Sequence, residues 1–246
     1  VGSRADRPFK ILAPITTLSF GDAFIFTSVA TRIAAAFEYS HCRFLVDHSR
    51  PYLRDITSFH PFSSAVDVID TDWRALPFAA LAGPTRTLDW REPAYHDLVV
   101  TSVLQSSSQF ADLPRCSLMI PDALTPSLTE TLSQMGLVDD NWFCVIHWRE
   151  PNYEYKAVAN ARDVDPRRYL PLIDHIIDVL DGQVVLCGHP EMTRPAAREG
   201  LVDLAGLENS WMLQAFATSR ARFFAGSPSG ATCMAHAFLI PSAHLD

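Results

Sequence analysis

The chain has 246 residues, of which 48% are hydrophobic and 20% charged, and its formal net charge at pH 7 is −8. This length and composition predict a folded globular protein with two small domains, and they exclude a disordered or fibrous chain. The acidic balance argues against nucleic-acid binding, because neutralising phosphates requires clustered Lys and Arg. No apolar run approaches the roughly 18 residues that a transmembrane helix needs, so we expect no membrane-spanning segment in this chain.

The first half of the chain alternates short apolar runs with helical stretches. An apolar helix is expected over residues 23–37, after a turn at Gly21 and Asp22. The predicted buried strands span residues 9–13, 42–46, 65–69 and 97–103. Such alternation is typical of a parallel sheet with helices on both faces, which predicts an α/β fold.

Between residues 105 and 141 the pattern loosens into polar and proline-containing stretches. One helix is expected here, capped by Thr125, begun by Pro126 and stopped near Gly136. We place the domain junction in this region, which gives domains of residues 1–138 and 139–246.

The second half repeats the strand and helix alternation. Its predicted strands span residues 142–146, 184–188, 202–204 and 221–225, and a helix is expected over residues 211–218. Another helix should start with Asp165 as N-cap and Pro166 at its first position, and end at Gly182, with Pro171 kinking it or delaying its start.

Five cysteines occur, without a C-x-x-C motif or a Cys/His spacing typical of zinc sites. Cys42, Cys144 and Cys187 lie in strand-like apolar runs. We therefore predict buried free thiols in a reducing compartment. The expected location is the cytoplasm, with or without peripheral contact with a membrane.

A turn rich in glycine and serine follows the apolar run 221–225 and leads into an Ala-rich helix; it contains Gly226, Ser227, Ser229, Gly230 and Thr232. Such a turn can direct backbone N–H groups, hydroxyls and the positive end of a helix dipole at a diphosphate. A tight turn with serine capping is the structural alternative. Pro228 breaks the Gly-x-Ser-x-Gly spacing of serine hydrolases, and dinucleotide and P-loop motifs are absent from the sequence.

Three blocks, residues 184–191, 202–207 and 224–241, resemble in order and spacing the donor-binding domain of bacterial heptosyltransferase-like GT-B glycosyltransferases. The resemblance implies two Rossmann-like domains facing across a cleft, with a nucleotide-sugar donor on the second domain. Heptose is not implied, because Pro228 replaces the acidic residue that heptosyltransferases usually carry before Ser-Gly.

Gly21 and Asp22 are similar to the first strand-to-helix turn of the same family. That likeness implies that Asp22 is the catalytic base for an acceptor hydroxyl, whereas an ordinary helix N-cap is the alternative. Gly21, Tyr153 and Lys156 are assigned to the acceptor side. Tyr153 and Lys156 belong to a loop that either covers the site or only packs against the protein.

The segment from His147 to Glu150 resembles the His-x-Arg motif of GT-B O-fucosyltransferases, whose arginine contacts the donor diphosphate. Arg149, Glu150 and Asp163 also resemble a motif of a group of bacterial glycosyltransferases, with Ala159 in place of its arginine. A surface salt bridge of Arg149 and a structural His147 are the alternatives.

Together the resemblances imply a metal-independent, inverting glycosyltransferase, without a cofactor beyond its nucleoside-diphosphate sugar, acting on a glycan, lipid-linked glycan or protein acceptor. The implied donor-binding residues are His147, Arg149, Glu150, Gly188, His189, Ser227, Ser229, Gly230 and Thr232. Two alternatives stay open. Asp70 and Asp72 could hold a metal as in GT-A enzymes, or the chain could be an inactive GT-B-like module that binds a nucleotide or glycan.

Overall fold

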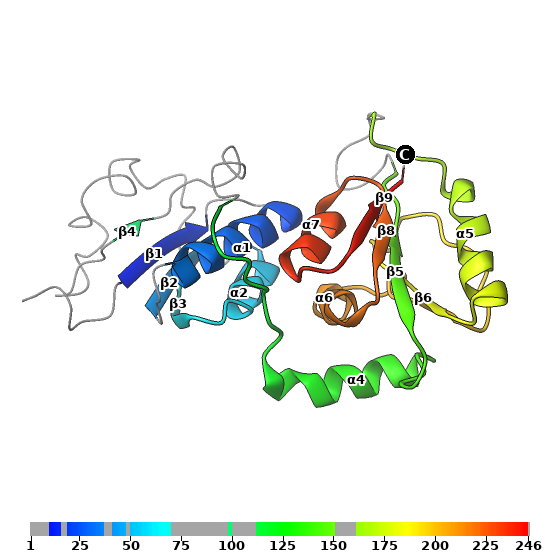
Figure 1. Cartoon of the computed structure of the whole chain (residues 1–246), viewed down its shortest axis with the longest axis horizontal. Coiled ribbons are helices and arrows are strands. Elements are labelled where there is room, and N and C mark those ends of the chain that lie inside the picture. The colour runs from blue at the N-terminus through cyan, green and yellow to red at the C-terminus, as the bar shows by residue number, and fades with distance from the viewer. Residues whose placement is uncertain are drawn as a thin grey trace, which may run out of the picture. The chain divides into compact units, whose positions relative to one another are not determined.

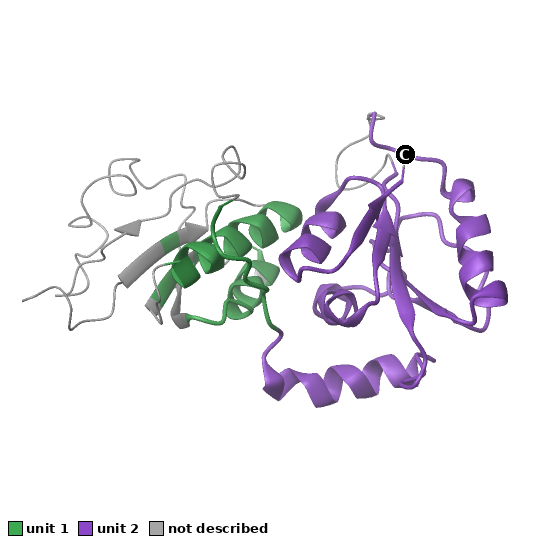
Figure 2. Ribbon diagram, viewed as in Figure 1, with its two compact units in different colours: residues 1–119 green, residues 120–246 purple. Residues whose placement is uncertain are grey.

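The computed structural model describes residues 10–15, 19–36, 41–47, 50–69, 98–99, 112–150 and 161–245. The chain separates into two compact units, residues 1–119 and 120–246 (Figure 2). The sequence pattern predicts the junction after residue 138, whereas the structure divides the chain after residue 119. The segment between these two positions carries helix α4 (Thr125–Gln134), which packs against α6 (Trp211–Arg220) in the second unit.

The described part of the first unit forms a parallel four-stranded sheet in the order β3-β2-β1-β4 (Figure 1). Its strands are β1 (Lys10–Ile15), β2 (His41–Asp47), β3 (Ser63–Ile69) and β4 (Leu98–Val99), and its helices are α1 (Phe20–Ala36) and α2 (Pro51–Ser58). Buried Phe24, Phe44 and Phe59 contribute to the core of this unit.

Helix α1 begins at Phe20 rather than at the predicted residue 23. Ser19 stands before the helix, and its Oγ accepts a hydrogen bond from the backbone N–H of Asp22 at 3.4 Å. Asp22 therefore lies in the first turn of α1, where a carboxylate is favourable beside the positive end of the helix dipole. The alternative that Asp22 is the N-cap was wrong, because Ser19 precedes the helix.

The described part of the second unit forms a parallel five-stranded sheet in the order β7-β6-β5-β8-β9. Its strands are β5 (Phe143–His147), β6 (Gln183–Leu186), β7 (Leu201–Asp203), β8 (Phe224–Gly226) and β9 (Ser242–His244). In chain order this is the arrangement 3-2-1-4-5 of Rossmann-type sheets. The parallel α/β architecture predicted from the sequence is therefore confirmed.

Helices cover both faces of the second sheet, as Figure 1 shows with α5 (Leu170–Asp174) on one side and α6 and α7 (Gly230–Ala237) on the other. Successive strand residues point to opposite faces. Val145 lies in the same buried cluster as Phe216 of α6, whereas Ile146 lies in the cluster of Ile173 of α5. β5 is thus apolar on both sides, which explains its continuous hydrophobic run.

The segment predicted as one helix after Asp165 has three parts. Asp165 caps it as expected, because its Oδ1 accepts from the backbone N–H of Arg167 at 3.0 Å. The short helix η5 (Pro166–Arg168), α5 and the π-helical turn η6 (His175–Val179) follow. The left-handed residue at its end is Asp181, with φ 52°, rather than Gly182. Gly182 has a different role: a Cβ there would lie 2.4 Å from the Trp142 ring.

All five cysteines are free, and Cys42, Cys144 and Cys187 are buried. Burial raises the pKa of each of these three thiols to about 12. None of the helices in the described ranges is both long and apolar enough to span a membrane.

Candidate functional site

The candidate site lies at the carboxyl ends of β5 and β8 in the second unit. The chain runs outward from β5 to β6 and β7 and then returns to the other side of β5 as β8. Ligands of open parallel sheets bind at the carboxyl ends of the strands where this reversal occurs. The residues after β5 and β8 are therefore the first candidates for ligand contact.

A close backbone approach joins these two strand ends. Ser227 N–H donates to the carbonyl of His147 at 3.3 Å, and the N–H of Arg149 donates to Ser227 Oγ at 2.8 Å. Gly226 permits the approach, because a Cβ at this position would lie 2.3 Å from the carbonyl oxygen of His147. Ser227 is fully buried, so water does not compete for the hydrogen bond by which its hydroxyl holds the Arg149 backbone.

His147 is buried at the end of β5, with Nδ1 3.0 Å from the carbonyl oxygen of Cys187. Burial lowers the pKa of His147 to about 4, with smaller contributions in the same direction from nearby His189 and Arg149. The ring is therefore neutral at pH 7. In the tautomer with the proton on Nδ1, this N–H donates a hydrogen bond to the backbone carbonyl of Cys187, and Nε2 is left as a hydrogen-bond acceptor.

The Arg149 guanidinium forms an ion pair with Asp163, with Nε 3.0 Å from Oδ1 and side chains that are 18% and 9% exposed. The backbone carbonyl of Arg149 accepts from Val164 N–H at 2.9 Å. Glu150 Oε2 accepts from the backbone N–H of Thr193 at 2.6 Å. The ion pair joins Nε, and the two Nη groups of the guanidinium carry further N–H donors.

Helix α7 begins directly after the loop that holds Arg149. Ser229 is its N-cap, because Ser229 Oγ accepts from the backbone N–H of Ala231 at 3.2 Å. Buried Thr232 donates its hydroxyl to the carbonyl of Ser227 at 3.1 Å. Gly230 is the first helical residue. The capped turn thus places the positive end of the helix dipole beside the Ser227 loop.

Gly188 and His189 follow β6, and Gly188 is held by a residue that the sequence analysis missed. Buried Gln214 on α6 accepts from Gly188 N–H at 3.0 Å and donates to the Gly188 carbonyl at 2.9 Å. It also donates to Ser210 Oγ at 2.7 Å. A polar side chain within the apolar stretch 213–218 was the available sequence signal.

The other sequence-predicted residues lie elsewhere. Gly21 and Asp22 belong to the first unit, in the first turn of the helix that follows β1. The acceptor-side residues Tyr153 and Lys156 and the carboxylates Asp70 and Asp72 fall outside the described residues. The described ranges contain no cluster of three or more His, Cys, Asp or Glu side chains suited to a metal ion.

Solved glycosyltransferases share this architecture. The glycosyl transferase family 9 structure from Veillonella parvula DSM 2008 has a TM-score of 0.63 at 13% identity, covering 95% of this chain and 80% of that one. E. coli ADP-heptose LPS heptosyltransferase II has a TM-score of 0.58 at 15% identity, covering 95% and 83%. E. coli heptosyltransferase WaaC with ADP-2-deoxy-2-fluoro heptose has a TM-score of 0.54 at 12% identity, covering 95% and 87%.

No protein-family model matches the sequence, and no curated protein matches it significantly. The likeness to the solved structures is one of fold, at low identity and over nearly the whole chain. The two parallel sheets seen here correspond to the two Rossmann-like domains of those structures. The chain therefore has the GT-B fold of heptosyltransferase-like glycosyltransferases, as the resemblance in its sequence implied.

Proposed function

We propose that this protein is a glycosyltransferase that transfers a sugar from a nucleoside-diphosphate sugar to a hydroxyl group of a glycan, a lipid-linked glycan or a protein. The observation that carries the proposal is the position of Arg149 at the reversal of strand order. Ser227 holds its backbone and Asp163 its guanidinium. A cation fixed in this way suits a diphosphate, which a GT-B donor domain must bind.

In the proposed donor complex, the Arg149 Nη groups contact the diphosphate, and the N-terminus of α7 adds a positive partial charge. Ser229 fixes the start of that helix through its cap. Buried Ser227 and Thr232 act as positioning residues, because their hydroxyls already bond within the turn. His147, Glu150, Gly188, His189 and Gly230 complete the donor-side set.

In the proposed reaction, Asp22 removes the proton of the acceptor hydroxyl while its oxygen attacks the anomeric carbon. The bond from that carbon to the diphosphate oxygen breaks, and the configuration of the carbon inverts. Arg149 and the α7 dipole stabilise the negative charge that develops on the leaving diphosphate. With this charge supplied by the protein, the transfer needs no metal ion.

The direct test is donor turnover in excess EDTA by the wild type, Arg149→Ala and Asp22→Ala. Arg167→Ala is the matched control, because Arg167 also pairs with an aspartate but is 84% exposed. We expect Arg149→Ala and Asp22→Ala to lose turnover and Arg167→Ala to keep it. Retained turnover in both variants would overturn the assigned roles. Loss of wild-type turnover with EDTA alone would favour the metal-dependent reaction at Asp70 and Asp72.

The nucleotide can be found by a thermal-shift screen against UDP, GDP, CMP, ADP and their sugars. A ligand that binds only the folded state adds about 2.7 kcal/mol of stability at a hundred times its dissociation constant. Stabilisation without hydrolysis or transfer, over a broad panel of acceptors, would favour an inactive binding module instead.

A further inference from the structure

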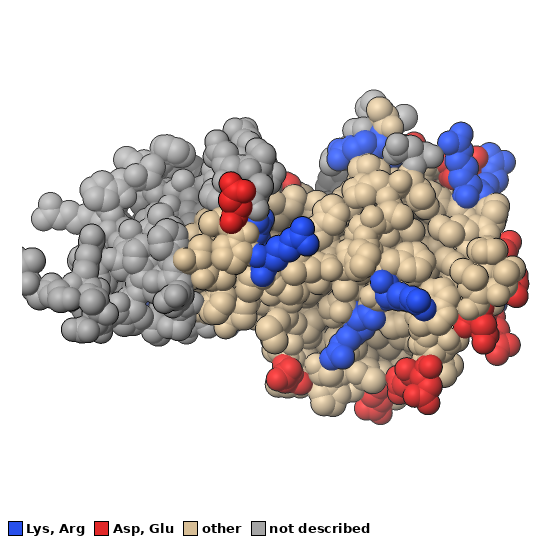
Figure 3. All heavy atoms as spheres, in the orientation of Figure 1, with Lys and Arg blue, Asp and Glu red and all other residues tan. Residues whose placement is uncertain are grey.

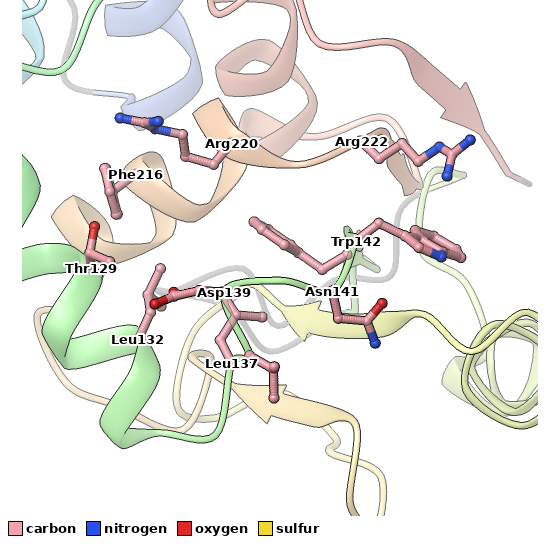
Figure 4. A pocket seen from close by; sticks show the side chains of 11 residues that line it. Thr129, Leu132, Leu137, Asp139, Asn141, Trp142, Phe216, Arg220 and Arg222 are labelled. Carbon is pink, nitrogen blue, oxygen red and sulfur yellow. The ribbon is translucent and has the colours of Figure 1, made fainter.

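A second concave site lies at the opposite edge of the second sheet, where β5 begins (Figure 4). It is an open pocket of about 400 Å³, and its apolar surface comes from Leu132, Leu137, Trp142, Phe143 and Phe216. These side chains come from α4, from the segment before β5, from the first residue of β5 and from α6. The pocket is therefore separate from the carboxyl edge that carries His147 and Arg149.

Two arginines line the pocket without an ion pair to any other described residue. The Arg220 guanidinium lies 5.4 Å from the centre of the Phe216 ring, and that of Arg222 lies 5.2 Å from the Trp142 ring. Figure 4 shows the two side chains extending in opposite directions from the pocket. Asp139 also lines the pocket. With two arginines against one carboxylate, the pocket has a positive balance in a chain whose net charge is −8.

An exposed apolar corner lies beside this pocket. Val179 and Leu180 are 66% and 48% exposed, and Asp181 follows them. The Trp142 ring, which lines the pocket, lies against Gly182, the residue that follows Asp181. We call the pocket and this corner together the amino-edge patch. Contiguous exposed apolar surface with a polar rim is typical of protein–protein contacts.

The two halves of the amino-edge patch carry opposite charge. The pocket carries two arginines against one carboxylate, Asp139, whereas the corner ends in the carboxylate of Asp181. Asp178, at the other end of the corner, already pairs with Arg198, whereas Asp181 makes no ion pair within the described ranges. Both halves lie on one edge of one sheet, so a two-fold axis at this edge can bring each corner to the other copy's pocket.

We propose that the amino-edge patch is the isologous interface of a homodimer. In this interface, Leu180 of each copy packs into the pocket of the other between Trp142 and Phe216, and Asp181 pairs with Arg222 across the two-fold axis. Charge-depleted cores with aromatic residues and arginine are typical of such interfaces. The arrangement does not use the carboxyl edge, so it stands whether or not the proposed transfer reaction is found.

Sedimentation equilibrium of the full chain over a wide concentration range tests this proposal. The wild type should dimerise, and Leu180→Glu should weaken the dimer by at least about tenfold, because it buries a charge in an apolar pocket. Leu207→Glu is the matched control, since Leu207 is 40% exposed and follows β7 at the opposite edge. A wild-type monomer at all concentrations, or a dimer that withstands Leu180→Glu, would overturn the proposal.

The pairing itself is tested by exchanging its charges. Arg222→Asp and Asp181→Arg should each weaken the dimer, and the double variant should restore it, because in a two-fold interface both exchanged charges meet again. Circular dichroism must show that each variant is folded. Asp181→Asn replaces Asp181→Arg if the arginine is not tolerated at φ 52°, since asparagine adopts this conformation readily. No loss on neutralisation, or no restoration by the double exchange, would contradict the assigned pair.

Discussion

The backbone N–H of Arg149 donates a 2.8 Å hydrogen bond to Oγ of Ser227, a residue 78 positions later in the chain. This bond ties the loop after β5 to the loop after β8, at the point where the strand order reverses. The Arg149 side chain is held separately, by Asp163. Backbone and side chain of the proposed diphosphate ligand are thus fixed by different partners, which pre-organises it for binding.

Removing the Ser227 hydroxyl should reduce donor use without removing any proposed ligand. Ser227→Ala leaves the Arg149 N–H without its partner, at a cost of about 1–3 kcal/mol. We expect donor kcat/KM to fall about tenfold, since a cost near 1.4 kcal/mol corresponds to this factor. Ser219→Ala removes a comparable hydroxyl, which donates to the carbonyl of Phe216 at 2.7 Å. This control should leave donor kcat/KM unchanged. Equal kinetics of both variants would refute the positioning role.

His147 should make the folded state sensitive to mild acid. Its pKa is lowered from the ordinary 6.5 to about 4, so the unfolded chain takes up a proton in this window and the folded chain does not. Stability from this group is therefore complete above pH 6.5 and is lost as the pH falls toward 4, by up to about 3 kcal/mol.

Urea unfolding between pH 4 and pH 6.5 measures how steeply the free energy of unfolding changes with pH. The wild type is compared with His147→Gln, whose side chain cannot take up a proton. The slope should be shallower in the variant. His60 is also buried, and burial lowers its pKa to about 4 as well, so His60→Gln should remove a separate share of the slope. An unchanged slope in His147→Gln would show that this ring does not titrate as described.

Leu239 identifies a position where glycine should stabilise the protein. It follows α7 with φ 58° and is 48% exposed, in the left-handed conformation that favours glycine after a helix. Leu239→Gly should raise the free energy of unfolding by about 0.5–1 kcal/mol, measured by thermal unfolding. Leu207→Gly, at an exposed leucine without positive φ, should lower it. A destabilised Leu239→Gly variant would mean that the leucine side chain outweighs the backbone strain.

Thiol reactivity tests the strand assignment in both units. Cys116 and Cys233 are half-buried, whereas the three buried thiols have pKa values near 12. Ellman's reagent needs a thiolate, so Cys116 and Cys233 should react in the native protein and the buried thiols only after unfolding. Rapid reaction of Cys144 would place β5 at the surface, and rapid reaction of Cys187 would do the same for the carboxyl end of β6.

The sequence predicted the parts of the fold that depend on local pattern. The apolar run 142–146 became β5, and Asp165 caps its helix as expected. β9 (Ser242–His244) was missed because it is only three residues long, carries no large apolar side chain and is mostly exposed, and it is ordered by pairing with β8. Edge strands of this kind lack the hydrophobic pattern that identifies buried strands.

The sequence motifs indicated candidate residues one by one but not the contacts between them. The motifs indicated Arg149, Ser227 and Ser229 separately. The bond from Arg149 to Ser227 and the clamp of Gln214 on Gly188 join residues far apart in the chain. Such contacts leave no periodicity or spacing in the sequence, so the structure was needed to separate the positioning hydroxyls from the proposed ligand.

The proposed function depends on the binding of a nucleotide-sugar diphosphate by Arg149. Its most direct test is isothermal titration of the wild type and Arg149→Ala with the nucleoside diphosphate found by the screen, with Arg167→Ala as the control. We expect the dissociation constant to rise at least about tenfold in Arg149→Ala, because a charge-assisted hydrogen bond is lost, and to be unchanged in the control. Equal affinity of wild type and Arg149→Ala would contradict the account.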